Sequence, residues 1–269
     1  MLTFATQTIV VSSFVAMASA SVAYAETVVG QAYSQDSFEA VYQELHQRSE
    51  QLHSVVYRNN SQAVFAQKDI DYRQGKSAPN IVFRSDHCNE SYALTKSVDE
   101  NAAVDTAFGV EIAMHYSNSC ADKRHNQSIT LTPPYVIDAG FDHHLRSNLD
   151  AVKRRDLSFN YPLPSRFREI SLKAKAINCD QVRDNFSLLL NAKNAQTSAR
   201  EDWQQCIVLR PSNWIIAQLF PPIYLAYNQQ QQLAMYAGKS NISNVNGDYE
   251  KVVILYSETT EQQQISFNR

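Results

Sequence analysis

Glycine is scarce in this sequence, and its scarcity excludes two common kinds of nucleotide site. The 269 residues contain six glycines, and no two of them stand at the spacing of a phosphate-binding loop or a dinucleotide-binding turn. An excess of positive charge is missing as well, because 24 Lys and Arg are set against 27 Asp and Glu, for a net charge of −3. Broad nucleic acid binding needs a clustered basic face that displaces counterions. The sequence therefore predicts no nucleic acid partner.

Short motifs for catalysis and metal binding are also missing. The sequence contains no HExxH, GxSxG or SxxK motif and no CxxC pair, so the zinc, serine hydrolase and thiol redox sites that these motifs build are not indicated. We therefore expect no catalytic residue, no metal and no cofactor. A pair of catalytic carboxylates stays open, because spacing along the chain does not reveal which acidic residues meet in the fold.

The first 25 residues predict a signal peptide. An apolar run from Ile9 to Ala25 ends in Ala23-Tyr24-Ala25, which fits a signal peptidase site and makes Glu26 the first mature residue. Residues 1–8 carry no Lys or Arg, which leaves the start codon open. A membrane anchor is the alternative, but the run is short and rich in Ser and Ala for a bilayer span. No later segment is apolar enough to cross a bilayer, so we expect a periplasmic protein with no integral membrane segment after cleavage.

Four cysteines remain in the expected mature chain: Cys88, Cys120, Cys179 and Cys206. An even number in an exported protein predicts two disulfides, with three connectivities open. We favour sequential pairing, Cys88 with Cys120 and Cys179 with Cys206. Each bond would close a loop of roughly 30 residues, which contributes on the order of 3–4 kcal/mol of stability by chain entropy.

Short runs rich in β-branched and aromatic residues, separated by turn residues, dominate the rest of the chain. Residues 37–52 are ambiguous, because their apolar side chains fit one helical face and also alternate as in a strand. The predicted strands are Val55–Tyr57, Ala63–Tyr72, Asn80–Asp86, Ser91–Lys96, Phe108–Tyr116, Ser128–Thr132, Arg168–Ile177, Phe186–Leu190, Cys206–Leu209, Ile223–Tyr227, Gln232–Tyr236 and Val252–Tyr256. This pattern predicts a mainly β (α+β) fold, a strongly curved antiparallel sheet or half-barrel with one or a few covering helices. Residues 26–269 are expected to form one β-rich domain with a loose polar tail at about 258–269.

One amphipathic helix is predicted over Ile137–Val152. Its apolar residues recur every three or four positions, and Asp138 is a plausible N-cap. The pattern predicts that Phe141, Leu145 and Leu149 face the sheet, with Arg146 and Asp150 in solvent. The helix is therefore expected to cover an apolar surface.

Six apolar residues are the candidates for contact with a ligand. Three lie on the predicted helix, and three belong to an apolar cluster that ends at Pro221-Pro222: Phe141, Leu145, Leu149, Trp214, Ile215 and Phe220. Apolar residues at helical spacing are also typical of an ordinary core. A continuous apolar cavity would favour the ligand interpretation, and a filled interior would favour the core interpretation.

Two polar clusters carry residue types used in catalysis. Asp142-His143-His144 lies on the predicted helix, where adjacent side chains point about 100° apart, and we interpret it as a surface or helix-cap group. Asp86-His87-Cys88 lies at a strand end, where neighbours face opposite sides of a sheet. His87 is therefore poorly placed to activate Cys88, and a disulfide role for Cys88 is favoured over a nucleophile.

Three stretches, residues 56–72 (VYRNNSQAVFAQKDIDY), 137–152 (IDAGFDHHLRSNLDAV) and 223–256 (ending GDYEKVVILY), together resemble a family of exported, uncharacterised proteobacterial proteins. The last stretch also resembles, more weakly, the closing strands of periplasmic lipoprotein-carrier proteins. That second resemblance implies a curved antiparallel half-barrel with helices over an apolar concave side, and it makes residues 137–152 part of a lid.

Three functions follow as hypotheses. The first is a non-enzymatic periplasmic protein that binds or carries an apolar or lipid-linked ligand. The second is an envelope structural or interaction protein whose interior is filled by its own side chains and whose protein partners are unknown. The third is an enzyme with an unrecognised site, which convergent ionisable side chains with shifted pKa values would favour.

Overall fold

Fourteen strands form one continuous antiparallel sheet in the computed structural model, which describes residues 26–96, 109–192 and 202–258. The predicted signal peptide and residues 259–269 of the predicted tail lie outside the described residues. The strands are β1 (Glu26–Ser34), β2 (Ala40–Arg48), β3 (Leu52–Arg58), β4 (Val64–Asp71), β5 (Asn80–Ser85), β6 (Ser91–Lys96), β7 (Val110–Asn118), β8 (Lys123–Leu131), β9 (Leu157–Leu163), β10 (Arg168–Ile177), β11 (Gln205–Pro211), β12 (Ile223–Tyr227), β13 (Leu233–Lys239) and β14 (Lys251–Glu258). The predicted mainly β class and curved antiparallel sheet are confirmed.

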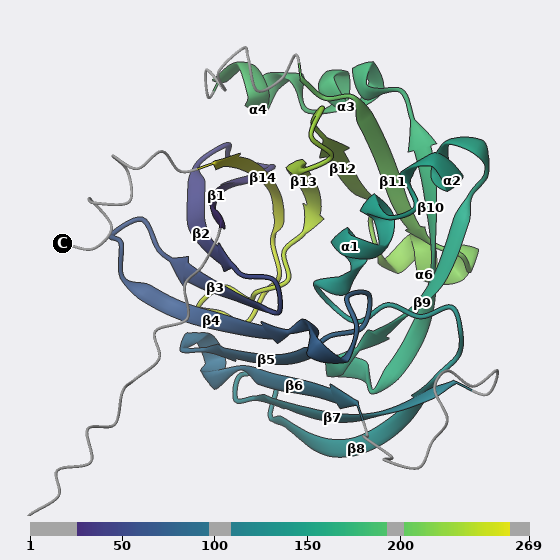
Figure 1. Cartoon of the computed structure of the whole chain (residues 1–269). Helices are drawn as coiled ribbons and strands as arrows, with labels where there is room; N and C mark the ends of the chain where they lie inside the picture. The colour runs from purple at the N-terminus through teal and green to yellow at the C-terminus, as the bar shows by residue number, and fades with distance from the viewer. Residues whose placement is uncertain (1–25, 97–108, 193–201, 259–269) are drawn as a thin grey trace, which may run out of the picture.

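The sheet curls until its two edge strands nearly meet. Its order runs from β8 down to β1, then from β14 down to β9, so the first and last strands are neighbours inside the sheet (Figure 1). Side chains of β9 and β10 form hydrogen bonds with the residue that follows edge strand β8. Glu169 accepts hydrogen bonds from the backbone N–H and the hydroxyl of Thr132 (2.9 and 3.0 Å), and the Asn160 amide donates to the Thr132 carbonyl at 2.7 Å. The result is a barrel-like sheet with one seam.

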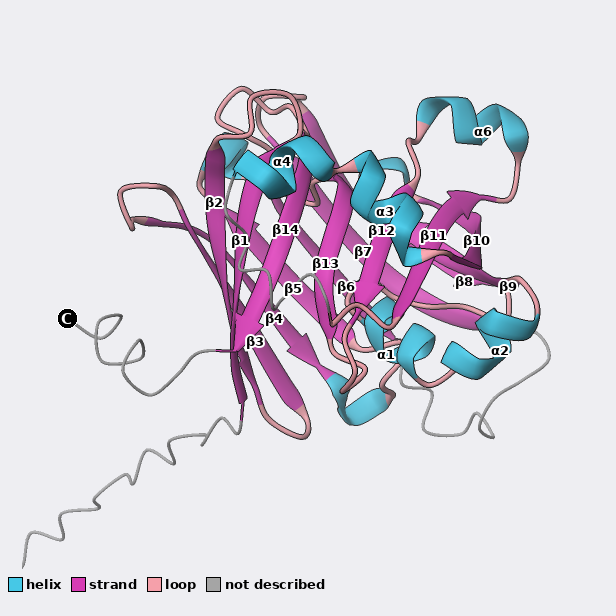
Figure 2. Cartoon of the chain, turned by 90° about the horizontal axis from the view of Figure 1, so that it is seen from above, coloured by secondary structure: helices cyan, strands magenta, loops and turns pink. Residues whose placement is uncertain are grey.

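The short helices lie on both faces of this sheet. They are α1 (Gly140–Arg146), α2 (Leu149–Arg154), α3 (Cys179–Asn185), α4 (Ser187–Ala192) and α6 (Trp214–Leu219), with single 3-10 turns at Tyr72–Gln74, His87–Asn89 and Pro164–Arg166. Helix α1 lies within the curve of the sheet (Figure 1), whereas α3 and α4 lie on the outside and α6 projects from the body (Figure 2). Within the described residues, no helix has the length and apolarity to span a bilayer.

The predicted single helix over Ile137–Val152 is wrong in its extent. The structure has two short helices, because the chain leaves helical geometry at Asn148 (φ −123°, ψ 16°), whose side-chain amide instead donates to the His144 carbonyl at 2.8 Å. Such local side-chain bonds compete with helix continuation. Asp138 is not the N-cap either. It adopts φ +39°, and α1 begins after Ala139 without a side-chain cap.

The predicted strand Phe186–Leu190 is also wrong, because Ser187–Ala192 forms α4. A short continuous apolar run fits a buried strand and a buried helix equally well. Leu189 and Leu190 are buried between this helix and the outer face of the sheet, in a cluster with Met235 and Val253. The other predicted strands are present with limits within a few residues, except that β8 begins at Lys123 instead of the predicted Ser128. The ambiguous residues 37–52 form β2 and the start of β3.

Both predicted disulfides are confirmed, with Cα–Cα distances of 5.2 Å for Cys88–Cys120 and 5.1 Å for Cys179–Cys206. The first joins the turn after β5 to the turn after β7. The second joins the first residue of α3 to β11 and so holds the outer helices against the sheet. Two disulfides fit a protein of an oxidising compartment outside the cytoplasm.

Candidate ligand-binding cavity

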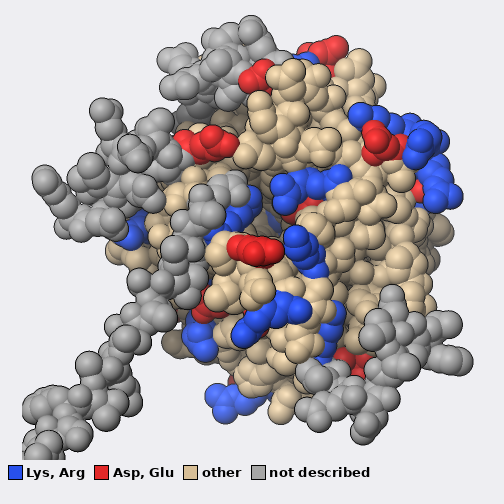
Figure 3. Space-filling model, viewed as in Figure 1, with Lys and Arg blue, Asp and Glu red and all other residues tan. Residues whose placement is uncertain are grey.

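A cavity of about 1100 Å³ occupies the centre of the curled sheet and opens to solvent. In the space-filling view, Lys and Arg side chains gather around a hollow at the centre of one face (Figure 3). Because strand side chains alternate between the two faces of a sheet, every second residue of the surrounding strands points inward. Those inward residues give the cavity two chemically different walls.

One wall is apolar and comes from β9 to β12. Its lining residues include Phe159, Leu163, Ile170, Leu172 and Leu209. Phe159, Leu172 and Leu209 also belong to a buried apolar cluster that packs this wall against helices α1 and α2. The wall therefore offers a preformed surface for the apolar part of a ligand.

The opposite wall is polar and comes from β2, β3 and β4. Successive inward positions of β2 are Glu44, His46 and Arg48, while His53 of β3 and Lys68 of β4 lie alongside them. Glu44, His46, His53 and Lys68 are all less than a tenth exposed. Burying such groups is costly unless each finds a partner, and the contacts on this wall supply those partners.

A chain of hydrogen bonds links three of these side chains. His46 Nε2 lies 2.9 Å from Glu44 Oε2, and His46 Nδ1 lies 3.0 Å from His53 Nε2. The Tyr256 hydroxyl donates to the same Glu44 oxygen at 3.1 Å. We call Glu44, His46 and His53 the relay.

Tyr256 reaches the relay because Gly30 stands between them. Gly30 of β1 pairs with Glu44 on one side and with Tyr256 on the other. A Cβ at this position would lie 2.7 Å from the Tyr256 ring, which is too close for any side chain. The absent side chain lets the ring cross β1 to reach Glu44.

His53, which lines the cavity, favours the neutral form of its ring. Burial lowers the pKa of His53 well below its usual value of 6.5. The positive charges of Arg48 and Lys68 lower the pKa further, as does that of His46 when His46 is protonated. Burial raises the pKa of the tyrosines that line the same cavity, so they stay protonated: Tyr57, Tyr161, Tyr236 and Tyr256.

A buried ion pair fastens α1 to the polar wall. Lys68 Nζ lies 2.9 Å and 3.1 Å from the two carboxylate oxygens of Asp138, and the Tyr92 hydroxyl donates to Asp138 at 2.7 Å. Asp138 is the residue with φ +39° just before α1. The side chain predicted to cap the helix thus anchors it inside the sheet.

Helix α1 turns polar residues toward the cavity. Asp142, His143 and Arg146 line it, and Arg146 Nε lies 3.3 Å from Asp142. The predicted surface role of Asp142 is therefore wrong, because the helix lies within the sheet rather than over it. Arg146 keeps about a third of its side chain exposed at the open cavity, and Asp150 is exposed as predicted. Burial, reinforced by the nearby Asp142 carboxylate, raises the pKa of Tyr227 well above its usual value.

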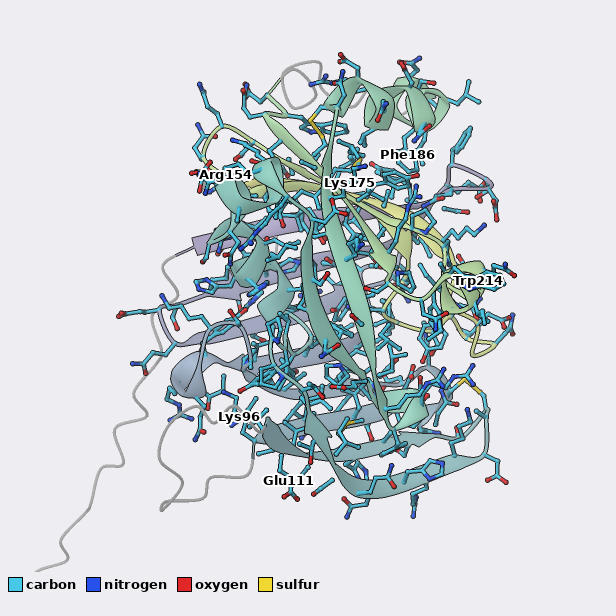
Figure 4. All side chains as sticks on the ribbon, turned by 90° about the vertical axis from the view of Figure 1, so that its right-hand side faces the viewer. Lys96, Glu111, Arg154, Lys175, Phe186 and Trp214 are labelled. Carbon is cyan, nitrogen blue, oxygen red and sulfur yellow. A yellow bond between two sulfur atoms is a disulfide. The ribbon has the colours of Figure 1, made fainter. Side chains whose placement is uncertain are left out.

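The six predicted ligand-contact residues fall into three places. Phe141 and Phe220 line the cavity. Leu145 and Leu149 are buried in the apolar cluster behind it. Trp214 and Ile215 are 71% and 56% exposed on α6, where Trp214 stands at the rim of the molecule (Figure 4). Their ligand-binding role stays a prediction.

His87 and His144 take structural positions. His87 Nδ1 lies 2.9 Å from the Ser243 carbonyl, and its ring stacks on Phe65 at 4.3 Å. His144 lies edge-on to Phe159, with ring centroids 5.3 Å apart. Among the described residues, no group of three or more His, Cys, Asp or Glu is arranged to hold a metal ion.

The relay was missed in the sequence. Its members lie on two strands whose pairing is not visible from spacing, and the helix-or-strand ambiguity of residues 37–52 hid which side chains share a face. One signal was present, because Tyr42, Glu44, His46 and Arg48 alternate with the period of a strand. An alternating run of large polar side chains indicates that a strand's inner face is not ordinary core.

No family model and no curated protein matches the chain. Among solved structures, it is similar to a beta-barrel-like protein of domain of unknown function DUF1849 from Brucella abortus, with a TM-score of 0.48 and 6% sequence identity. The match covers 88% of this chain and 99% of that one. The function of that domain is itself unknown, and nothing about function follows from a likeness of this degree.

Proposed function

We propose that this protein is a non-enzymatic binding or carrier protein of the periplasm, and that its ligand is amphipathic, with an apolar body and a polar end. The observation that supports this most directly is the cavity with one apolar and one polar wall. Its volume of about 1100 Å³ is slightly larger than the pockets typical of small-molecule sites.

The physical basis is burial without a chemical step. An acyl or other apolar chain gains about 25 cal/mol for each Å² of surface that it buries against the wall from β9 to β12. The polar end then faces β2 to β4, where hydrogen-bonding groups are already oriented by their partners. A lipid or a lipid-linked molecule has this division into two parts.

The periplasmic location rests on the predicted signal peptide and the two disulfides. Each cysteine of the chain is in a disulfide, which fits an oxidising compartment. Soluble transfer of an apolar molecule across an aqueous compartment requires an enclosing cavity, and the curled sheet supplies one.

The test fills the cavity and asks whether binding disappears. Leu172 of β10 lines the cavity, whereas its neighbour Lys173 points outward and is about half exposed. We expect Leu172→Trp to weaken binding of a fluorescent fatty acid, 11-(dansylamino)undecanoic acid, at least tenfold. The matched control Lys173→Trp adds the same ring outside and should bind like the wild type.

Failure of the wild-type chain to bind this probe, together with native mass spectra of periplasmic protein that show no lipid adduct, would overturn the proposal. The envelope interaction protein is then the second candidate. It is favoured by one observation, the exposure of Trp214 and Ile215 on the projecting helix α6. A photo-crosslinking residue at position 215 should in that case capture one defined partner, and Trp214→Ser should abolish the capture.

A further inference from the structure

We propose that His53 is the hydrogen-bond acceptor for an uncharged hydroxyl group at the polar end of the ligand, and that Glu44 holds it in the accepting state through His46. This inference rests on the proposed binding function and names the chemistry of the ligand's polar end. It assigns positioning roles to Glu44, His46 and Tyr256, which lie in line behind His53.

The direction of the relay follows from its first member. The Glu44 carboxylate accepts hydrogen bonds and does not donate them. It already accepts from the Tyr256 hydroxyl, and its contact with His46 Nε2 at 2.9 Å places a proton on that nitrogen. In a neutral imidazole the other nitrogen is then an acceptor. His46 Nδ1 therefore receives the proton of His53 Nε2 across 3.0 Å.

This order of protons leaves one nitrogen, Nδ1 of His53, without a proton and without a hydrogen bond inside the relay. With its proton on Nε2, His53 has a lone pair on Nδ1. That nitrogen has no hydrogen-bond partner among the residues that the structure describes, and it belongs to a side chain that is 6% exposed and lines the cavity. Because this acceptor faces the open cavity, a donor group on a bound ligand can form a hydrogen bond with it.

The charges around His53 select among donors. Arg48 and Lys68 lie close enough to depress the pKa of His53, and the same positive charges repel an ammonium group on a ligand. An ionised carboxylate or phosphate has no proton to donate to the lone pair of Nδ1. A neutral hydroxyl, as in a glycerol or sugar group, donates a hydrogen bond without either repulsion.

The geometry is fixed before a ligand arrives. Tyr256 holds Glu44 from the far side, and its ring lies edge-on to His46 with centroids 5.6 Å apart. His53 stacks on Tyr72 at an interplanar angle of 15°. A preorganised acceptor gains more specificity than a mobile one, because the ligand does not have to order the side chain on binding.

The experiment uses 1-O-dodecylglycerol and the same molecule with both hydroxyls methylated, a change that removes the hydrogen-bond donors and adds two methyl groups. Each displaces the dansyl probe from the full-length mature chain. We expect the hydroxyl form to bind about tenfold more tightly than the methylated form, the effect of one hydrogen bond to a buried acceptor. His53→Phe should reduce this ratio to about one, whereas His115→Phe, on the outer face of β7, should leave it unchanged.

A second measurement reads the relay itself without a ligand. Long-range ¹H–¹⁵N spectra of the histidine rings should show His53 protonated on Nε2 and bare on Nδ1. The side-chain amide of Glu44→Gln can both accept and donate a hydrogen bond, so this variant should mix the two proton orders of the relay in the ring spectra and lower the preference for the hydroxyl form.

The outcomes separate the two proposals. If neither dodecyl ligand binds, the proposed function fails and this inference fails with it. If both bind equally well to the wild-type chain, binding stands and the hydroxyl assignment is overturned. A proton on His53 Nδ1 in the ligand-free protein also overturns it, because that nitrogen would then be a donor. Tight binding of dodecylammonium or dodecanoate in preference to dodecylglycerol would replace the neutral hydroxyl by a charged group.

Discussion

His53 shows at the scale of a single residue how a binding wall is held ready. Its ring is neutral because burial and neighbouring positive charges both disfavour the protonated form. This neutral form allows His53 to donate a hydrogen bond to His46 through Nε2 and to keep a lone pair on Nδ1. The same arrangement makes the stability of the fold depend on pH.

The sign of this dependence follows from the shift. The pKa of His53 is lower in the folded chain than its usual 6.5, so below pH 6.5 the unfolded chain binds a proton that the folded chain does not. Stability is therefore complete above about pH 6.5 and falls as the pH is lowered toward the folded-state pKa. One proton sets an upper limit of about 1.4 kcal/mol per pH unit for this slope.

We predict that His53→Gln, which keeps a hydrogen-bonding group but does not titrate, unfolds with a shallower dependence on pH than the wild type between pH 6.5 and 5. Urea unfolding at several pH values measures the slope. His115→Gln on the exposed face of β7 is the control and should keep the wild-type slope. An unchanged slope in His53→Gln would show that His53 is not depressed in the folded state.

At the scale of an element, helix α1 contributes side chains both to the buried core and to the cavity. Leu145 is fully buried in the cluster behind the cavity, whereas Phe141, one turn earlier, lines the cavity itself. The two positions share one face of the helix, but Leu145 contacts the packed cluster whereas Phe141 also faces the cavity. Substituting each therefore separates packing from ligand contact.

We predict that Leu145→Ala lowers the free energy of unfolding by roughly 2–5 kcal/mol, because it leaves a void in a packed cluster. Its effect on affinity for the dansyl fatty acid should be small. Phe141→Ala should lower the free energy of unfolding by less than Leu145→Ala, since part of the Phe141 side chain already faces the cavity. It should lower the affinity for the probe by more. Denaturant unfolding and probe titration on both variants measure the two effects. A reversed pattern would place the ligand on the other side of α1.

The strands could be predicted wherever apolar and polar residues alternate, as in β10, whose limits Arg168 and Ile177 were both predicted. Alternation does not distinguish a strand from a helix in a continuous apolar run. The run around Leu189 and Leu190 fits either structure, and it forms a helix packed on the outer face of the sheet. β1 and β9 were missed, and β9 contains Pro162, a residue that sequence reasoning takes as a strand breaker.

The site was less predictable than the fold, because its walls come from strands far apart in the chain. Phe141 and Phe220 could be proposed from apolar spacing. Glu44 and His53 could not, because their meeting depends on the register between β2 and β3 and on the missing side chain of Gly30. Curvature of the sheet, which decides whether a cavity exists, leaves no local mark in the sequence.

At the scale of the whole molecule, the two disulfides secure different parts of the barrel-like sheet. Cys88–Cys120 ties neighbouring turns at one end of the sheet, and Gly247 packs against it so closely that a Cβ would lie 3.2 Å from the Cys88 sulfur. Cys179–Cys206 ties α3 to the outer face of β11. Neither touches the cavity, so both support stability rather than binding.

We predict that replacing either pair with serine lowers the free energy of unfolding by roughly 3–4 kcal/mol, the chain-entropy value for loops of this length. The Cys179→Ser, Cys206→Ser variant should in addition speed hydrogen exchange in α3 and α4 while keeping probe affinity. Faster exchange in β2 and β3 instead would show that this disulfide supports the cavity wall. Denaturant unfolding and hydrogen exchange with mass spectrometry provide the measurements.

The pairing of β1 with β14 sets an order of events for a chain that is synthesised from its N-terminus. Val28 pairs with Glu258, 230 residues later, so β1 has only β2 as a neighbour until nearly all of the sequence has emerged. During that interval its other edge presents unpaired N–H and C=O groups to any strand nearby. Contacts so distant in sequence form slowly, and the open edge invites association between unfinished chains. Correct folding therefore depends on shielding β1 from other chains until β14 is available to pair with it.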